Sequence, residues 1–311
     1  MNMKKRLLLV FAFFTVIGAL TAGAFAQINS IVLPLQQMGF NPLLCGILMA
    51  LCVGVVILGG TQRVAKLASF VVPIKAFLYL LTAAIILAFH VDQILPAFKL
   101  MFTSAFHGST MVGGVLGYGT FKAITSGFDR GLFATDAGTG LVPILQSSAK
   151  TDHPVIDGVV TLVAPFLVMI VCTLTGLVLL VTGAWQQLDL KSTTMVTHAF
   201  QKGLGSSLGF YVVLVALTLF GYTTILAWAC CAEKALNFIT GNSSLNWFKY
   251  LYIGFIPLGT LLNVELIWVL ADISISLMLV TNLIGIAGLS NEVIGTSRAF
   301  FIKELEPQMT C

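Results

Sequence analysis

The sequence predicts an all-α protein that crosses a membrane several times, and three observations support this class. Mean hydropathy is +1.00, 58% of the 311 residues are apolar, and only 9% are charged. Soluble domains carry roughly 25% charged residues, so this composition leaves too little polar surface for a water-soluble globule. Apolar runs near the length of about 20 residues that crosses a bilayer also recur along the whole chain.

About eight apolar runs follow one another, and each is expected to form one transmembrane helix. Polar or charged segments separate most of them. The runs cover residues 7–34, 42–60, 68–89, 110–147, 158–183, 208–231, 250–270 and 274–295.

The cations between the runs predict the orientation of the chain. With the N-terminus in the cytoplasm, the cytoplasmic segments hold ten Lys and Arg residues and the external segments hold three. This is the asymmetry that the positive-inside rule describes, and it leaves both termini cytoplasmic. The formal net charge of +4 is too small an excess to indicate a nucleic-acid partner.

The first run has two interpretations. Lys4, Lys5 and Arg6, the apolar run and the Ala-Phe-Ala at 24–26 resemble a cleavable secretory signal. The same residues could be a retained helix. We favour the helix because the run from Leu7 to Ala26 is 20 residues long, whereas the apolar part of a signal has about 7 to 15. Cleavage would leave the orientation of the other seven runs unchanged.

The fourth run is interrupted by polar residues and glycines in the stretch "ATDAGTG" at 134–140. Glycine weakens a helix, and Thr and Asp side chains compete for its backbone partners. Unwound backbone at membrane depth is tolerated where it lines protein or a water-filled cavity, and transporters use it to bind substrate and ions. We therefore predict a broken helix, with its break at about 131–140. A re-entrant or amphipathic surface segment is the alternative.

Other motifs carry no chemistry. Gly117 and Gly119 begin a G-x-G, but Lys122 stands where a dinucleotide fingerprint requires its third glycine. The six cysteines and four histidines lack the spacing of a disulfide framework or metal site, and we expect neither an enzyme nor a resident cofactor.

The chain resembles the sodium:alanine (amino acid:cation) symporters of the amino acid–polyamine–organocation group. The stretch "GFDRGLFATDAGTGLVPILQSSAKTDHP" is similar to the signature of that family, and it departs from it where Ala134, Thr135 and Asp136 replace Ser-Asn-Glu. Supporting stretches are "AQINS", "GGTQRVAK", "VCTLTG", "FGYTTILAW" and "ADISISLMLVTNLIGI". The residues that match the signature are Arg130, Gly131, Phe133, Ala137, Gly138, Gly140, Pro143, His153 and Pro154.

The resemblance implies a five-plus-five inverted-repeat (LeuT-type) transporter fold in which the first helix of each repeat is broken. Residues 110–295 correspond to a second repeat, residues 1–109 to the last three helices of a first repeat, and residues 296–311 to a cytoplasmic tail. The first two helices of the fold, with the Gly-Thr-Gly-Asn motif of the family, have no counterpart in the sequence. The expectation is a partial fold, with the missing helices supplied by a separate polypeptide or lost.

The resemblance also assigns roles to individual residues. Thr223 and Thr224 are expected to bind the coupling ion, sodium, because hard cations prefer oxygen ligands; without the family, two threonines in a helix more often bond back to the preceding turn. The alternative to a functional role for Asp136 is that it forms an ion pair with Arg130. Lys75 is expected to extend its side chain to the cytoplasmic side. The residues expected at the substrate are Gln27, Phe133, Thr135, Asp136, Gly138, Gly140 and Trp228.

The implied function is sodium-coupled symport of a small neutral amino acid, alanine or glycine, in the inner (plasma) membrane. The implied partners are the amino acid, sodium and membrane lipid, without nucleic acid. Two alternatives remain open: a non-transporting remnant or assembly partner, and a signal-headed seven-span protein of unrelated role.

Overall fold

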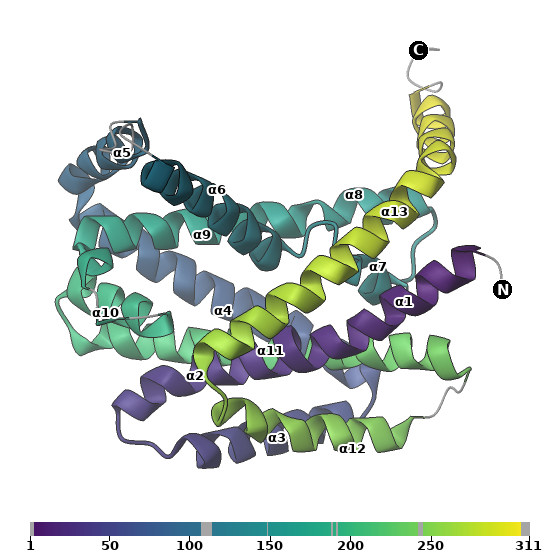
Figure 1. Cartoon of the computed structure of the whole chain (residues 1–311), viewed down its shortest axis with the longest axis horizontal. Helices are drawn as coiled ribbons and strands as arrows, with labels where there is room; N and C mark the ends of the chain where they lie inside the picture. Colours follow the sequence, from purple (N-terminus) through teal and green to yellow (C-terminus); the bar gives the residue numbers. More distant parts are fainter. Residues whose placement is uncertain are drawn as a thin grey trace.

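The computed structural model describes residues 3–106, 114–147, 149–187, 189–190, 192–241 and 245–305. Helices joined by short turns make up this part of the chain, which agrees with the predicted all-α class (Figure 1). The start of α1 and the end of α13 lie on the same side of the molecule in Figure 1.

The first span is one continuous helical rod at the centre of the structure. It consists of α1 (Met3–Gly18), a π-helix (Ala19–Phe25) and α2 (Ala26–Gln37). The rod packs against α11 and α13, and Ala19, Ala22 and Ile28 are completely buried. The residues on both sides of Ala26 therefore belong to the core, and the retained first helix stays a prediction.

Turns that require glycine separate the next helices. Gly39 and Gly60 both have a φ of +87°, a conformation that glycine adopts without steric cost. Asn41 caps the helix between them, because its Oδ1 accepts hydrogen bonds from the backbone N–H groups of Leu43 and Leu44. The helices of this region are α3 (Pro42–Ile57), α4 (Thr61–Phe89) and α5 (Val91–Phe106).

The middle of the chain contains the predicted broken helix. It is formed by α6 (Gly114–Thr135) and α7 (Leu141–Gln146), with the interruption at 136–140. The following helices are α8 (Pro154–Thr161), α9 (Val163–Thr182), α10 (Thr193–Leu204) and α11 (Ser207–Thr240).

The last two predicted spans have the wrong boundary. Their connection was expected at 271–273, but those residues lie inside α13 (Val264–Leu305), and the turn is at 261–263. Pro257 lies in a short 3-10 helix (Ile256–Thr260) that follows α12 (Asn246–Phe255), and Asn263 Oδ1 accepts a hydrogen bond from the backbone N–H of Glu265. Neither position of the turn contains Lys or Arg, so the predicted orientation is unaffected.

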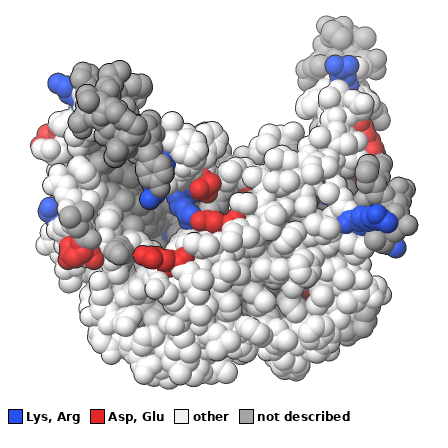
Figure 2. All heavy atoms as spheres, in the orientation of Figure 1, with Lys and Arg blue, Asp and Glu red and all other residues white. Residues whose placement is uncertain are grey.

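Within the described residues, five helical segments are long and apolar enough to cross a membrane, which agrees with a multi-pass protein. The helix Pro42–Ile57 is apolar but shorter, and the arrangement of eight crossings stays a prediction. Figure 2 shows a largely uncharged face, with most of its charged atoms at the ends and beside a central hollow. The five segments are Lys5–Gln37, Thr61–Phe89, Pro154–Thr182, Ser207–Thr240 and Val264–Ile302.

Candidate functional site

The break in the fourth span is narrower than predicted. Helix α6 continues through Gly131 to Thr135, and only residues 136–140 are irregular. Asp136 has a φ of 52°, and Gly138 and Gly140 have φ values of 77° and 85°. A left-handed conformation costs a non-glycine residue roughly 1–2 kcal/mol, although Asp tolerates it better than most. Three residues with positive φ therefore interrupt the helix here.

Three other helices hold the break in place. Asn282 of α13 donates a hydrogen bond of 2.8 Å to the carbonyl oxygen of Gly138. A Cβ at Gly140 would lie 2.7 Å from the ring of Phe11 in α1 and 2.9 Å from Asn282. Lys234 of α11 donates to the carbonyl oxygen of Ile144, at 2.9 Å. The irregular backbone is thus clamped by α1, α11 and α13.

A small cavity of about 170 Å³, here called the inner cavity, lies beside the break. Its wall comes from the first span, α6 and the break, α11 and α13. Five of the predicted site residues meet there although they are up to about 200 positions apart in the sequence. These five are Gln27, Phe133, Asp136, Thr224 and Trp228, and the other lining residues are Ala22, Ala134 and Ile275.

The remaining predicted substrate residues line a different space. Thr135, Gly138 and Gly140 face a depression of about 520 Å³ between the break, α8, α9 and α13, here called the side groove. Asp136 lines both spaces, so the break separates them. The other lining residues are Ala137, Val142, Pro143, Gln146, Pro154, Asp157, Gly158, Thr161, Leu162, Pro165, Asn282 and Ile286.

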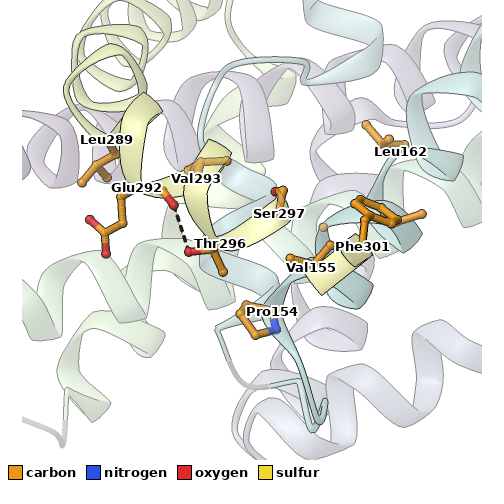
Figure 3. A pocket seen from close by; sticks show the side chains of 11 residues that line it. Pro154, Val155, Leu162, Leu289, Glu292, Val293, Thr296, Ser297 and Phe301 are labelled. Carbon is orange, nitrogen blue, oxygen red and sulfur yellow. Dashed lines mark hydrogen bonds between the residues drawn. The ribbon is translucent and has the colours of Figure 1, made fainter. Parts of the chain in front are cut away.

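The side groove continues along α8 and α13 as an apolar depression of about 450 Å³. Figure 3 shows side chains of the two helices around it, with Pro154, Val155 and Leu162 on one side and Leu289 and Val293 on the other. Thr296 donates its hydroxyl to the carbonyl oxygen of Glu292, as drawn in Figure 3, so its own polar group is satisfied within the helix.

The two predicted ion ligands, Thr223 and Thr224, have different surroundings. Thr224 lines the inner cavity. The Thr223 hydroxyl accepts a hydrogen bond from Lys75 Nζ and lies 3.0 Å from the carbonyl oxygens of Leu219 and Phe220. A positive charge beside Thr223 opposes a second cation there, so Thr224 is the better placed of the two.

Lys75 contradicts its predicted position. Its side chain was expected to extend to the cytoplasmic side, but the residue is only 4% exposed, and Nζ lies 4.4 Å from the centre of the Phe220 ring. The hydrogen bond to Thr223 and the aromatic face replace part of the water that a buried ammonium loses. A helix pattern gives no signal for such a partner, because α4 and α11 are far apart in the sequence.

Arg130 forms an ion pair with Asp272 of α13. The alternative explanation of Asp136, as the partner of Arg130, is therefore not supported. Its guanidinium lies 4.8 Å from the centre of the Trp268 ring, and that ring lies 4.9 Å from the ring of Phe133. Phe133 in turn lines the inner cavity. The ion pair and two aromatic rings therefore form a layer over one side of the cavity.

Asp272 and Asn282 are site residues that we did not single out in the sequence. Both belong to "ADISISLMLVTNLIGI", whose polar residues interrupt an otherwise apolar run. Such residues in a membrane span mark functional positions often enough that this signal was available.

Comparison with known proteins identifies relatives over the whole chain. A family model described as "Sodium:alanine symporter family" matches residues 1–309. An uncharacterized transporter of Haemophilus influenzae is 37% identical over 94% of this chain and 65% of its own length. The sodium/alanine symporter AgcS of Methanococcus maripaludis is 34% identical over 95% of this chain and 65% of its own length. A sodium/proton-dependent alanine carrier protein of Bacillus sp. PS3 is 30% identical over 80% of the chain and 59% of its own length.

The chain thus spans somewhat less than two thirds of the length of these relatives.

Proposed function

This chain belongs to the sodium:alanine symporter family, and we propose that it provides the second repeat and the last three helices of the first repeat of a sodium-coupled symporter for small neutral amino acids, alanine or glycine. The family and its relatives are transporters rather than enzymes. The observation that carries the proposal is the inner cavity, where Gln27, Phe133, Asp136 and Thr224 meet beside a broken helix. Sodium is the coupling ion of the proposal.

The size and lining of the inner cavity favour a small zwitterion. Its volume of about 170 Å³ is well below the roughly 300–1,000 Å³ of sites for drug-sized ligands. The carboxylate of Asp136 can accept hydrogen bonds from an ammonium group, and the amide of Gln27 can donate to a carboxylate. Phe133 and Trp228 leave room only for a short apolar side chain.

Sodium is proposed to bind at the Thr224 side of this cavity. Hard cations take oxygen ligands, and Thr224 with its hydroxyl and Asp136 with its carboxylate both line the inner cavity. Thr223 is the less favourable ligand because Lys75 already donates to its hydroxyl.

We further propose that the side groove receives helices supplied from outside the described residues, equivalent to the first two of the fold. In the most apolar 18-residue stretch of the α8–α9 segment, only 6% of the residues are buried. The corresponding share is 33%, 39% and 44% in three other spans. Lipid could cover an apolar face, but it cannot satisfy Asp136, Asp157 and Gln146 in the groove. The relatives are also longer than the part that this chain matches. A separate polypeptide is the proposed source.

The ion site is tested by comparing the two threonines. Thr224→Ala is expected to raise the sodium concentration needed for half-maximal alanine binding by roughly 10-fold, because one oxygen ligand is removed. Thr223→Val, which keeps the shape of the side chain, is the matched control and is expected to leave that concentration nearly unchanged. The measurement is binding of labelled alanine at varied sodium by the chain co-expressed with the two helices proposed to cover the side groove. A larger loss in Thr223→Val would place the ion beside Lys75 instead.

The orientation in the inner membrane is a proposal that rests on the ten-to-three distribution of cations. Reporter fusions at Gln37 and Gln308 are expected to give an external and an internal signal, respectively, because both termini are cytoplasmic. Mass spectrometry of the purified protein should give an N-terminus before Leu7. A mature protein that begins at Gln27 would contradict the retained first helix.

A further inference from the structure

Trp228 of α11 lies lengthways along the first span, over two of its glycines. A Cβ added to Gly23 would lie 2.5 Å from both Cβ and Cγ of Trp228. A Cβ added to Gly18 would lie 3.1 Å from Cζ3 and 3.3 Å from Cη2 of the same indole. The base of the indole therefore rests on Gly23 and its far ring on Gly18, and Trp228 is only 5% exposed.

The π-helix explains how two residues five positions apart can share one face. In an α-helix, with 3.6 residues per turn, they would point roughly 140° apart. Between Gly18 and Phe25 the helix is of the i→i+5 type, which brings residues five apart nearly one above the other. An ordinary helix would replace one of the two glycines beneath the indole with a side chain.

Side chains of Tyr252 and Gln27 contact backbone carbonyl groups of this unusual segment. The hydroxyl of Tyr252, which is completely buried, lies 3.3 Å from the carbonyl oxygen of Ala19. The amide of Gln27 donates to the carbonyl oxygen of Ala22, at 3.2 Å. Ala22 of the π-helix lines the inner cavity together with Gln27, which hydrogen-bonds to it, and Trp228, which rests on the π-helix, so this segment shapes one side of the cavity.

We propose that Gly23 is a positioning residue that sets the size limit of the substrate through Trp228. A Cβ added at Gly23 would meet Cβ and Cγ of Trp228, the side-chain atoms nearest to the backbone of α11. A movement of the outer ring of the indole alone therefore cannot relieve the overlap. Any side chain at position 23 forces Trp228 or the whole helix to shift, and the cavity wall shifts with it. The size limit rests on the proposed function, whereas the position of Trp228 does not.

The first experiment measures the position of Trp228 without substrate. In a chain with Trp185→Phe, Trp247→Phe and Trp268→Phe, the fluorescence of the remaining Trp228 reports its surroundings. Adding Gly23→Ala is expected to shift its emission maximum. The matched control is Gly176→Ala, because a Cβ there meets nothing within 4 Å. An unshifted emission in a folded Gly23→Ala protein overturns the proposal.

The second experiment measures selectivity in the chain co-expressed with the two helices proposed to cover the side groove. Gly23→Ala is expected to lower the ratio of alanine to glycine affinity by roughly tenfold, because overpacking acts first on the larger substrate. If Gly23→Ala does not fold, Trp228→Leu with Gly23 intact is expected to admit amino acids larger than alanine. An unchanged ratio, or no gain of larger substrates, overturns the size limit. Absence of sodium-dependent alanine binding by the unmodified protein would instead contradict the proposed function.

Discussion

Asp136→Asn is expected to weaken sodium-dependent alanine binding by roughly 10- to 150-fold, the equivalent of losing about 1.5–3 kcal/mol from a hydrogen bond to a charged group. Asp136 is the only acid among the described residues that line the inner cavity. Asparagine keeps the size of the side chain and tolerates the left-handed backbone that position 136 adopts. The loss should therefore come from the missing charge rather than from unfolding.

Asp157→Asn is the matched control for this prediction. Asp157 lines the side groove but not the inner cavity, so its charge is not expected to contact the substrate. Both variants would be compared by labelled-alanine binding at a fixed sodium concentration, after size-exclusion chromatography shows that each is folded. A greater loss of affinity in Asp157→Asn than in Asp136→Asn would move the binding site into the groove.

Covering the side groove with the two proposed helices is expected to have the largest effect on transport, because we expect sodium-dependent alanine uptake only when those helices are present. Coupled transport requires sodium and substrate to favour one conformation over another, and a ligand without such a preference shifts nothing. When lipid faces the groove, the polar groups of Asp136 and Asp157 lose their partners at a cost of several kcal/mol each. Helices that cover the groove would restore those partners and complete the site.

Some of the predicted site residues line one cavity and others do not, and their roles stay predictions. The family resemblance assigned roles to Gln27, Phe133, Asp136, Thr224 and Trp228, which come from three separate spans, and all five line one cavity. Composition and hydrophobic runs predicted the membrane class, and the glycines and polar residues of "ATDAGTG" predicted a break at about 131–140. They could not predict which spans would be neighbours, because an apolar run gives no information on its partner.

The wrong predictions have specific physical causes. The turn at 261–263 was missed because Leu261 and Leu262 are apolar, and a hydropathy average does not detect a helix that ends at such residues. Lys75 was expected to extend to the cytoplasmic side because a lysine in an apolar run usually reaches the surface. In the structure its ammonium group instead donates to Thr223 and lies over the ring of Phe220 in the interior. The π-helix has no sequence signal of its own, since its seven residues, ALTAGAF, would also suit an α-helix.

Uptake of labelled alanine into liposomes with an inward sodium gradient is the most direct test of the claim that this chain forms a sodium-coupled symporter together with the helices proposed to cover the side groove. The purified chain would be compared with the chain co-expressed with the first two helices of the Methanococcus maripaludis symporter. We expect concentrative, sodium-dependent uptake only from the co-expressed pair, and its loss when the gradient is collapsed. Equal uptake by the chain alone, or no sodium dependence in the pair, would contradict the claim.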